Sequence, residues 1–78
     1  MPWRDVFWND IIAEHIALHG LTRADVENAV CNATTEEESD STGRPVLFGF
    51  AIDGRKIAVV YEVVDRITVI PITAYEVK

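Results

Sequence analysis

Residues 46–64 read VLFGFAIDGRKIAVVYEVV, in which two runs rich in β-branched and aromatic residues flank the dipeptide Asp53-Gly54. Asp-Gly between two such runs is the strongest short-range signal for a β-hairpin, because glycine readily adopts the backbone conformation that a tight turn requires. The sequence therefore predicts antiparallel strands over residues 46–52 and 56–64, joined at this dipeptide.

A two-residue turn would set the register of this hairpin by pairing Phe50 with Ile57. One face would then be apolar and would receive the helices; it would carry Val46, Phe48, Phe50, Ile57, Val59 and Tyr61. The other face would also be apolar, with Leu47, Ala51, Ala58, Val60, Ile67 and Val69. A solvated face is rarely so apolar, so we expect a cover, either a partner or second copy, or residues 33–45 and the chain ends.

Two further segments extend or border this sheet. A turn at Asp65-Arg66 leads into a third strand over residues 67–74. Pro71 cannot donate a ladder hydrogen bond, so this strand is expected at a sheet edge or bulged there. Residues 33–45 are polar and acidic, and we expect a solvated polar loop that includes a short edge strand near residues 34–37.

Residues 9–32 are predicted to form two helices joined by a tight turn. Apolar residues recur at helical spacing, Asn9 is a suitable N-cap, and Gly20 is placed to end the first helix. Thr22 followed by Asp25 approximates a capping box for the second helix. The predicted fold class is therefore α+β, with two N-terminal helices packed on one face of a three- to four-stranded antiparallel meander.

Length and charge narrow the functional classes. The 78 residues suit a single domain, 1–78, and no apolar run is long enough to span a membrane. The lone Cys31 cannot form an internal disulfide and the N-terminus has no signal-peptide pattern, so a cytoplasmic location is expected. The net charge of −6 repels phosphate backbones, although residues 44–78 carry five basic and four acidic groups and leave room for a local anion site.

Motifs for metal and cofactor chemistry are missing from the sequence. There is no phosphate-cradling glycine loop and no Cys/His zinc spacing. His15 and His19 are four residues apart, as two metal ligands on one helix face would be, but no third candidate lies beside them. We therefore expect neither a metal nor a cofactor.

Arginine and tyrosine side chains in the second half of the chain allow two interpretations. Arg55 can clamp a phosphate through its planar guanidinium, or it can simply close the hairpin. The phenols of Tyr61 and Tyr75 are suggestive of a site, or Tyr61 can simply lie in the core and Tyr75 can anchor the C-terminus. Composition and spacing alone favour the structural interpretation of all three.

An ordered set of short motifs points to a known family. The motifs are Trp8, His15, His19-Gly20-Leu21-Thr22, Val26-Glu27, Gly43-Arg44, the strand with Gly49, Gly54-Arg55, Val59-Val60-Tyr61 and Val69-Ile70-Pro71-Ile72-Thr73-Ala74. In this order, and across nearly the whole chain, the set resembles the toxin of the BrnT/BrnA type II toxin–antitoxin system. The resemblance implies a RelE-like α+β fold and a metal-independent ribonuclease that a cognate antitoxin protein neutralises.

Residue roles are also implied by this resemblance. Catalytic roles fall on His19 as a proton carrier, on Arg55 as a phosphate contact, and on Tyr61 as a positioning group. Arg44 and Tyr75 would bind the RNA substrate. Ribonucleases of this type promote attack of a 2′-hydroxyl on the neighbouring phosphate by electrostatic stabilisation and general acid–base catalysis.

Departures from the family pattern lower the expected activity. Tyr75 stands where the family has an arginine, and the chain is acidic whereas such toxins are basic. Each lost cation weakens affinity for RNA, so we expect weak RNA binding and weak or lost ribonuclease activity. The alternative is a non-catalytic protein-interaction module on the same fold, which acts as a homodimer or in a hetero-complex through its second apolar sheet face.

Overall fold

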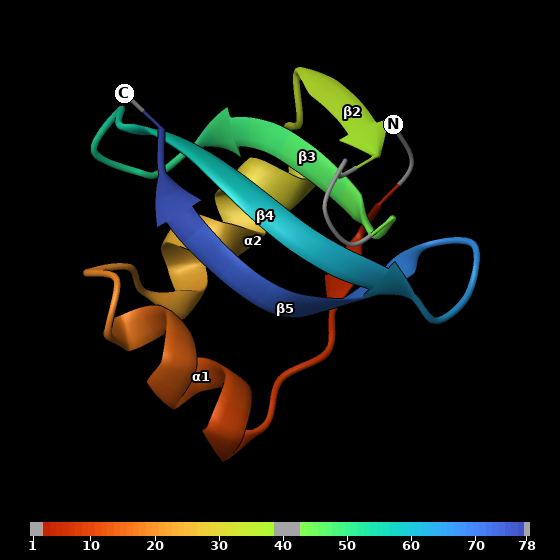
Figure 1. Cartoon of the computed structure of the whole chain (residues 1–78), viewed down its shortest axis with the longest axis horizontal. Helices are drawn as coiled ribbons and strands as arrows, with labels where there is room; N and C mark the ends of the chain where they lie inside the picture. Colours follow the sequence, from red (N-terminus) through yellow and green to blue (C-terminus); the bar gives the residue numbers. More distant parts are fainter. Residues whose placement is uncertain (1–2, 39–42, 78) are drawn as a thin grey trace.

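The computed structural model describes residues 3–38 and 43–77, which form two helices and five strands. In chain order the elements are β1 (Asp5–Val6), α1 (Asp10–Ala17), α2 (Arg23–Cys31), β2 (Thr35–Glu38), β3 (Pro45–Phe50), β4 (Lys56–Val63) and β5 (Thr68–Glu76). Figure 1 shows one twisted sheet with α2 behind it and α1 beside β5. Neither helix in the two described ranges is long and apolar enough to cross a membrane.

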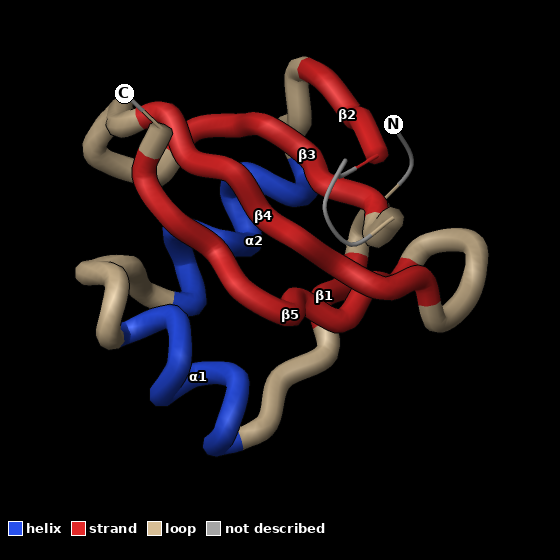
Figure 2. The backbone as a smooth tube through the Cα atoms, in the orientation of Figure 1, coloured by secondary structure: helices blue, strands red, loops and turns tan. Residues whose placement is uncertain are grey.

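The sheet has the strand order β1-β5-β4-β3-β2. The pairs among β2, β3, β4 and β5 are antiparallel, whereas β1 pairs parallel to β5 (Figure 2). The prediction of a three- to four-stranded antiparallel meander is therefore wrong, because the sheet is five-stranded and mixed. The Phe7 amide donates a hydrogen bond of 2.9 Å to the Val69 carbonyl oxygen at the parallel pair. A two-residue strand has no periodicity by which a sequence can reveal it.

The two helices contact different parts of the sheet. α2 packs on β1, β3 and β4 and buries Val26, Ala29 and Val30. α1 instead contacts β5, and Ile16 is its only buried residue. The predicted arrangement of two helices packed together on a meander is thus corrected: α2 covers the sheet, and α1 lies at β5 with most of its residues exposed.

The helix boundaries agree with local signals in the sequence. Asn9 caps α1 by accepting a hydrogen bond of 2.8 Å from the Ile12 amide. Thr22 and Asp25 form the predicted capping box of α2, in which each side chain accepts a hydrogen bond from the other residue's backbone amide. Gly20 has a φ of +75°, as expected for a residue that ends a helix. The existence and position of both predicted helices are confirmed.

The hairpin between β3 and β4 closes through a three-residue loop instead of the predicted two-residue turn. The Ala51 amide donates to the Arg55 carbonyl oxygen at 2.8 Å, and the Gly54 amide donates to the Ala51 carbonyl oxygen at 3.0 Å. Gly54 has a φ of +94°, which matches a turn followed by a left-handed glycine. The register therefore moves by one residue, so that Gly49 pairs with Ile57.

This one-residue shift exchanges the two faces of β3. Leu47 is buried in the core, while Phe48 and Phe50 lie on the opposite face. The physical reason is space, since a Cβ on Gly49 would lie 2.6 Å from the carbonyl oxygen of Ala29 in α2. A phenylalanine on the side of β3 that faces α2, where Gly49 lies, would hold α2 away from the sheet.

Two predictions about irregular strands are confirmed. β2 is the edge strand next to β3, close to the short strand considered near residues 34–37. β5 is bulged next to Pro71, because Pro71 pairs with Tyr61 while Thr73 pairs with Val60. Residues 39–42 of the predicted solvated loop lie outside the described residues.

Candidate functional site

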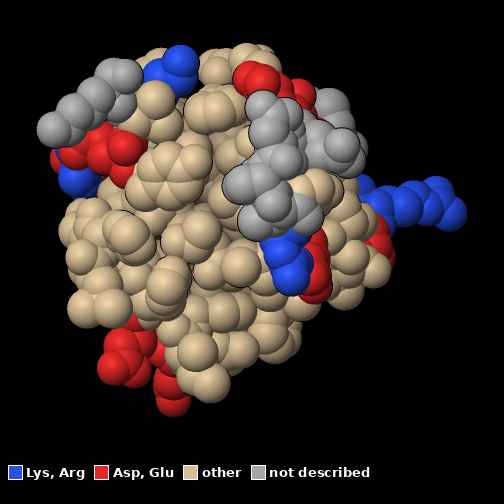
Figure 3. Space-filling model, in the orientation of Figure 1, with Lys and Arg blue, Asp and Glu red and all other residues tan. Residues whose placement is uncertain are grey.

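One face of the sheet is apolar and carries neither described helix (Figure 1). We call it the open sheet face; by strand register its apolar members are Val46, Phe48, Phe50, Ala58, Val60, Ile70 and Tyr75. This face is turned to the viewer in Figure 3, where a wide area without charged side chains lies at its centre. The exposed fractions of Phe50 and Tyr75 are 43% and 42%. The exposed aromatic rings make this face a candidate for contact with another molecule.

The second apolar face predicted from the sequence therefore exists, but with different residues on β3. Ala58 and Val60 belong to it as predicted. The predicted members that are buried in the core instead are Leu47, Ala51 and Val69. Phe48 and Phe50 replace Leu47 and Ala51, because the three-residue hairpin loop reverses the orientation of β3. Val69 lies on β5, where it pairs with Val63.

Charged side chains lie at the two ends of β4 on the open sheet face. Lys56 begins the strand, and its Nζ lies 5.6 Å from the centroid of the Phe48 ring. Glu62, six residues later, forms an exposed ion pair with Arg44. Side chains alternate across a strand, so Lys56 and Glu62 point to the same side of the sheet.

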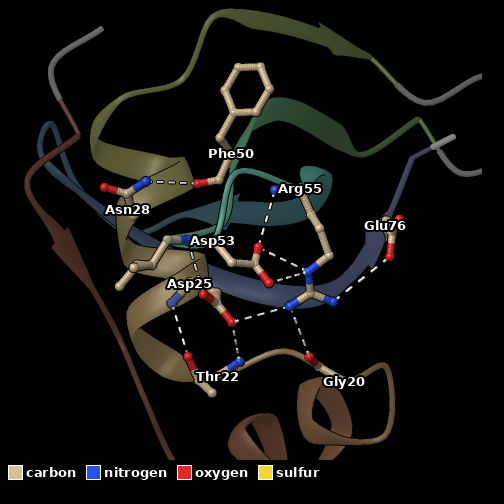
Figure 4. Close-up of polar contacts among 9 residues, drawn as sticks. Gly20, Thr22, Asp25, Asn28, Phe50, Asp53, Arg55 and Glu76 are labelled. Carbon is tan, nitrogen blue, oxygen red and sulfur yellow. Dashed lines mark hydrogen bonds and ion pairs between the residues drawn. The ribbon is translucent and has the colours of Figure 1, made fainter.

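A second group of polar residues surrounds Arg55 at the hairpin loop (Figure 4). The Arg55 Nε lies 2.8 Å from Asp53 Oδ2. Its Nη1 lies 3.8 Å from Glu76 Oε1, and its Nη2 lies 3.9 Å from Asp25 Oδ2. We call these four residues the Arg55 cluster; one cation and three carboxylates give it a formal charge of −2.

The Arg55 cluster ties separate segments together. Asp25 belongs to α2, and Glu76 ends β5. Arg55 Nη2 also donates a hydrogen bond of 3.4 Å to the Gly20 carbonyl oxygen, in the turn after α1. Arg55 could bind a phosphate here only if some of these contacts broke. The geometry therefore indicates a structural role, in which Arg55 joins the hairpin loop to α2, β5 and the turn after α1.

Asp25 is the buried member of the Arg55 cluster, with an exposed fraction of 7%. Its Oδ2 accepts a hydrogen bond of 3.0 Å from the Thr22 amide, and its Oδ1 accepts one of 3.1 Å from the Ile52 amide. Burial acts to raise the pKa of Asp25, but these hydrogen bonds and the charge of Arg55 outweigh it and lower the pKa below 3.8. The carboxylate is thus held ionised between α2 and the hairpin loop.

Tyr61, a predicted catalytic residue, is buried on the helix side of the sheet with an exposed fraction of 2%. Its hydroxyl donates a hydrogen bond of 3.2 Å to Glu36 Oε1, and its ring lies edge-on to Trp3 with the centroids 5.8 Å apart. Burial, together with the charge of Glu36, raises the pKa of Tyr61 to about 12. The phenol therefore has the surroundings of a core residue.

The other predicted site residues are spread over the molecule. His19 is exposed in the turn after α1, and the Arg55–Gly20 hydrogen bond brings this turn to Arg55. Arg44 precedes β3 and Arg55 follows it, so the six-residue strand separates them by about 20 Å. Tyr75 lies on the open sheet face. Among the described site residues, Arg55 thus contacts the turn of His19 through Gly20 and the residue next to Tyr75, Glu76.

The two histidines lie close together but do not belong to a larger ligand cluster. The ring centroids of His15 and His19 are 5.6 Å apart, and His15 Nε2 lies 3.1 Å from Thr73 Oγ1. Within residues 3–38 and 43–77, no group of three or more His, Cys, Asp or Glu side chains is arranged to hold a metal ion.

Three carboxylates matter to these sites although no motif in the sequence marks them as site residues. They are Asp25, Glu36 and Glu76. The capping-box position of Asp25 revealed its local partner, Thr22, but not its contact with the hairpin loop. Nothing in the acidic run distinguishes Glu36 from its neighbours, because its partners Trp3 and Tyr61 are distant in the chain.

Comparison with known proteins gives no relative: no family model, curated protein or solved structure matches the chain. The BrnT-like resemblance therefore stays an expectation from short sequence motifs.

Proposed function

We propose that this chain is a non-catalytic protein-interaction module that binds a folded partner through the open sheet face. The observation that carries the proposal is the exposure of aromatic rings on a sheet face that neither described helix covers. Aromatic side chains bury much apolar area at little entropic cost and are enriched at protein interfaces. Association would remove this surface from water.

The distribution of charged groups favours binding of a protein over cleavage of RNA. The Arg55 cluster has a formal charge of −2, which repels a phosphate backbone. Tyr61 lies in the core, and Arg44 lies about 20 Å from Arg55 along β3. The groups expected to act on one substrate therefore do not converge on one place.

The proposal is tested by purifying the full chain under native conditions and measuring its mass by light scattering. An assembly heavier than the single 8.7 kDa chain is expected. Phe50→Asp places a charge on the open sheet face at an exposed position and is expected to release the partner. Ile11→Asp is the matched control, because Ile11 is 80% exposed on α1 and lies off this face. A wild-type chain that stays monomeric at high concentration and carries no partner would overturn the proposal.

A BrnT-like ribonuclease toxin, neutralised by a cognate antitoxin, is the second candidate. The observation in its favour is the contact between Arg55 and Gly20, which places the His19 turn beside a guanidinium. Purified chain is then expected to cleave RNA at low salt, and His19→Ala to abolish the cleavage. Intact RNA after incubation with the wild-type chain would exclude this candidate.

A cytoplasmic location is part of the proposal. Cys31 is a free, exposed thiol, and its Sγ lies 4.0 Å from the Arg4 carbonyl oxygen. A reducing compartment keeps such a thiol from forming disulfides between chains.

A further inference from the structure

We infer that the occupant of the open sheet face is a second copy of this chain, packed so that the two β4 strands run in opposite directions around a two-fold axis. The inference rests on the proposed function and names its partner. Two copies related by such an axis present the same surface to each other. This surface must therefore be complementary to itself.

β4 has a self-complementary pattern. Lys56, Ala58, Val60 and Glu62 alternate onto the open sheet face, so the strand carries a cation, two apolar residues and an anion in order. Of the two apolar residues, Val60 is half-buried and Ala58 is fully buried. A two-fold axis between Ala58 and Val60 places Glu62 of the second copy over Lys56, and Lys56 of the second copy over Glu62. One symmetric contact thus forms two pairs of opposite charge around an apolar centre.

These opposite charges cannot meet within one copy. Lys56 and Glu62 are six residues apart on an extended strand, a separation of about 20 Å. Lys56 lies over the Phe48 ring, and Glu62 pairs with Arg44, but both residues are exposed, with the Glu62 side chain at 52%. Their outer atoms are therefore accessible to a second copy.

Aromatic rings supply contact area beside the β4 strands. Ala58 pairs with Phe48 on one neighbouring strand and with Tyr75 on the other, and Phe50 follows on β3. Packed sheets lie about 10 Å apart, and side chains of both inner faces fill the gap. The rings of two copies can fill such a gap, while the Tyr75 hydroxyl stays hydrated at the rim.

The charge distribution permits this contact despite the net charge of −6. Among the described side chains of the open sheet face, the basic Arg44 and Lys56 balance the acidic Glu37 and Glu62. The acidic Arg55 cluster lies on the helix side. The sheets of two copies would already be about 10 Å apart. Acidic groups behind them would thus lie beyond the Debye length of about 8 Å and repel only weakly.

The inference is tested by exchanging the charges at the two ends of β4. Sedimentation equilibrium of the purified full chain measures the dimer dissociation constant of each variant. Lys56→Glu brings carboxylates together at both ends of the contact, and we expect it to raise the dimer dissociation constant at least about tenfold. Glu62→Lys brings cations together and is expected to act in the same direction. The double variant Lys56→Glu/Glu62→Lys restores opposite charges and is expected to bring the dissociation constant back toward the wild-type value.

A matched control separates this contact from the effect of net charge. Arg66→Glu changes the net charge as Lys56→Glu does, but Arg66 lies in the exposed turn between β4 and β5. We expect its dissociation constant to stay close to that of the wild type. Lys56 and Glu62 are also exposed, so thermal unfolding followed by circular dichroism is expected to show that all variants fold.

The outcomes distinguish this inference from the proposed function. Loss of the dimer in both single variants and recovery in the double variant supports the inference. A dimer that neither single variant weakens overturns it. A wild-type chain that binds a different protein, which Phe50→Asp releases, also overturns it but leaves the proposed function intact. A monomer without any partner overturns both.

Discussion

Gly49 in β3 lies against the backbone of Ala29 in α2. A Cβ placed on Gly49 would come within 2.6 Å of the Ala29 carbonyl oxygen and 2.8 Å of its Cα, closer than real Cβ contacts. This approach brings α2 onto the sheet and determines which face of β3 points inward. It therefore also determines which aromatic residues form the open sheet face.

Gly49→Ala is expected to destabilise the protein by about 1–3 kcal/mol, because the added methyl group overpacks the contact between α2 and β3. Urea unfolding measures the change in free energy. Adding Ala29→Gly is not expected to rescue the variant, since the clashing atoms at position 29 belong to the backbone. A stability equal to that of the wild type would show that α2 does not pack this closely.

Asp25→Asn is expected to lower the free energy of unfolding by about 1–3 kcal/mol, because one of two part-buried amide donors loses its carboxylate acceptor. Asp10→Asn is the comparison, since Asp10 lies exposed in the first turn of α1. Loss of its charge near a helix N-terminus costs at most about 1 kcal/mol. Equal effects of the two substitutions would contradict a role for Asp25 in joining α2 to the hairpin loop.

Acid is expected to destabilise the folded chain below about pH 3.8. The pKa values of Asp25, Asp53 and Asp65 are lowered from 3.8 in the folded state. Hydrogen bonds from Arg55 are the main cause for Asp53, and a hydrogen bond from the Ile67 amide is the main cause for Asp65. The folded state therefore binds these protons less tightly than the unfolded chain, and the stabilisation is lost as the pH falls through the lowered pKa values.

Urea unfolding at a series of pH values measures this loss. Asp25→Asn removes one of the three titrating groups, so its free energy of unfolding should depend less steeply on pH than that of the wild type. The same steepness in both proteins would contradict a lowered pKa for Asp25.

Alkali is expected to destabilise the folded chain through Tyr61. Its pKa rises from 10.0 to about 12 on folding, so the folded state retains the phenol proton more tightly than the unfolded chain. The stabilisation is complete below pH 10 and is lost as the pH rises toward 12. Tyr61→Phe is expected to lower stability at neutral pH by about 0.5–1.5 kcal/mol through loss of the hydrogen bond to Glu36.

Tyrosinate absorbance and urea unfolding between pH 9 and pH 12 test the role of Tyr61. The wild type should lose more stability over this interval than Tyr61→Phe, because only the wild type has the raised phenol pKa. A similar loss in both proteins would show that the Tyr61 phenol titrates as it does in the unfolded chain.

Local interactions explain what the sequence predicted correctly. Asn9 bonds to Ile12 and Thr22 bonds to Asp25, each within one helical turn, so four consecutive residues are enough to reveal a helix start. Pro71 lacks an amide hydrogen wherever it stands, so a bulge or edge could be predicted without knowing the neighbouring strand.

The candidate sites depended on contacts that a linear pattern does not contain. Arg55 was recognised as a candidate, but its partners Asp25 and Glu76 lie 30 and 21 residues away in the chain. Tyr61 was considered as either a core or a functional residue, and only the packing of Trp3 and Glu36 distinguishes the two.

Neighbouring residues are enough to specify the two helices, their caps and the presence of a hairpin at Asp53-Gly54, because each of these features depends on local contacts. Long-range packing sets the length of the hairpin loop, the parallel pairing of β1 and the identity of the open sheet face. A two-residue and a three-residue loop are both compatible with Asp-Gly, and the choice between them reverses every side chain of β3. Burial of Leu47 and the close contact of Gly49 with Ala29, both across long chain separations, favour the three-residue loop.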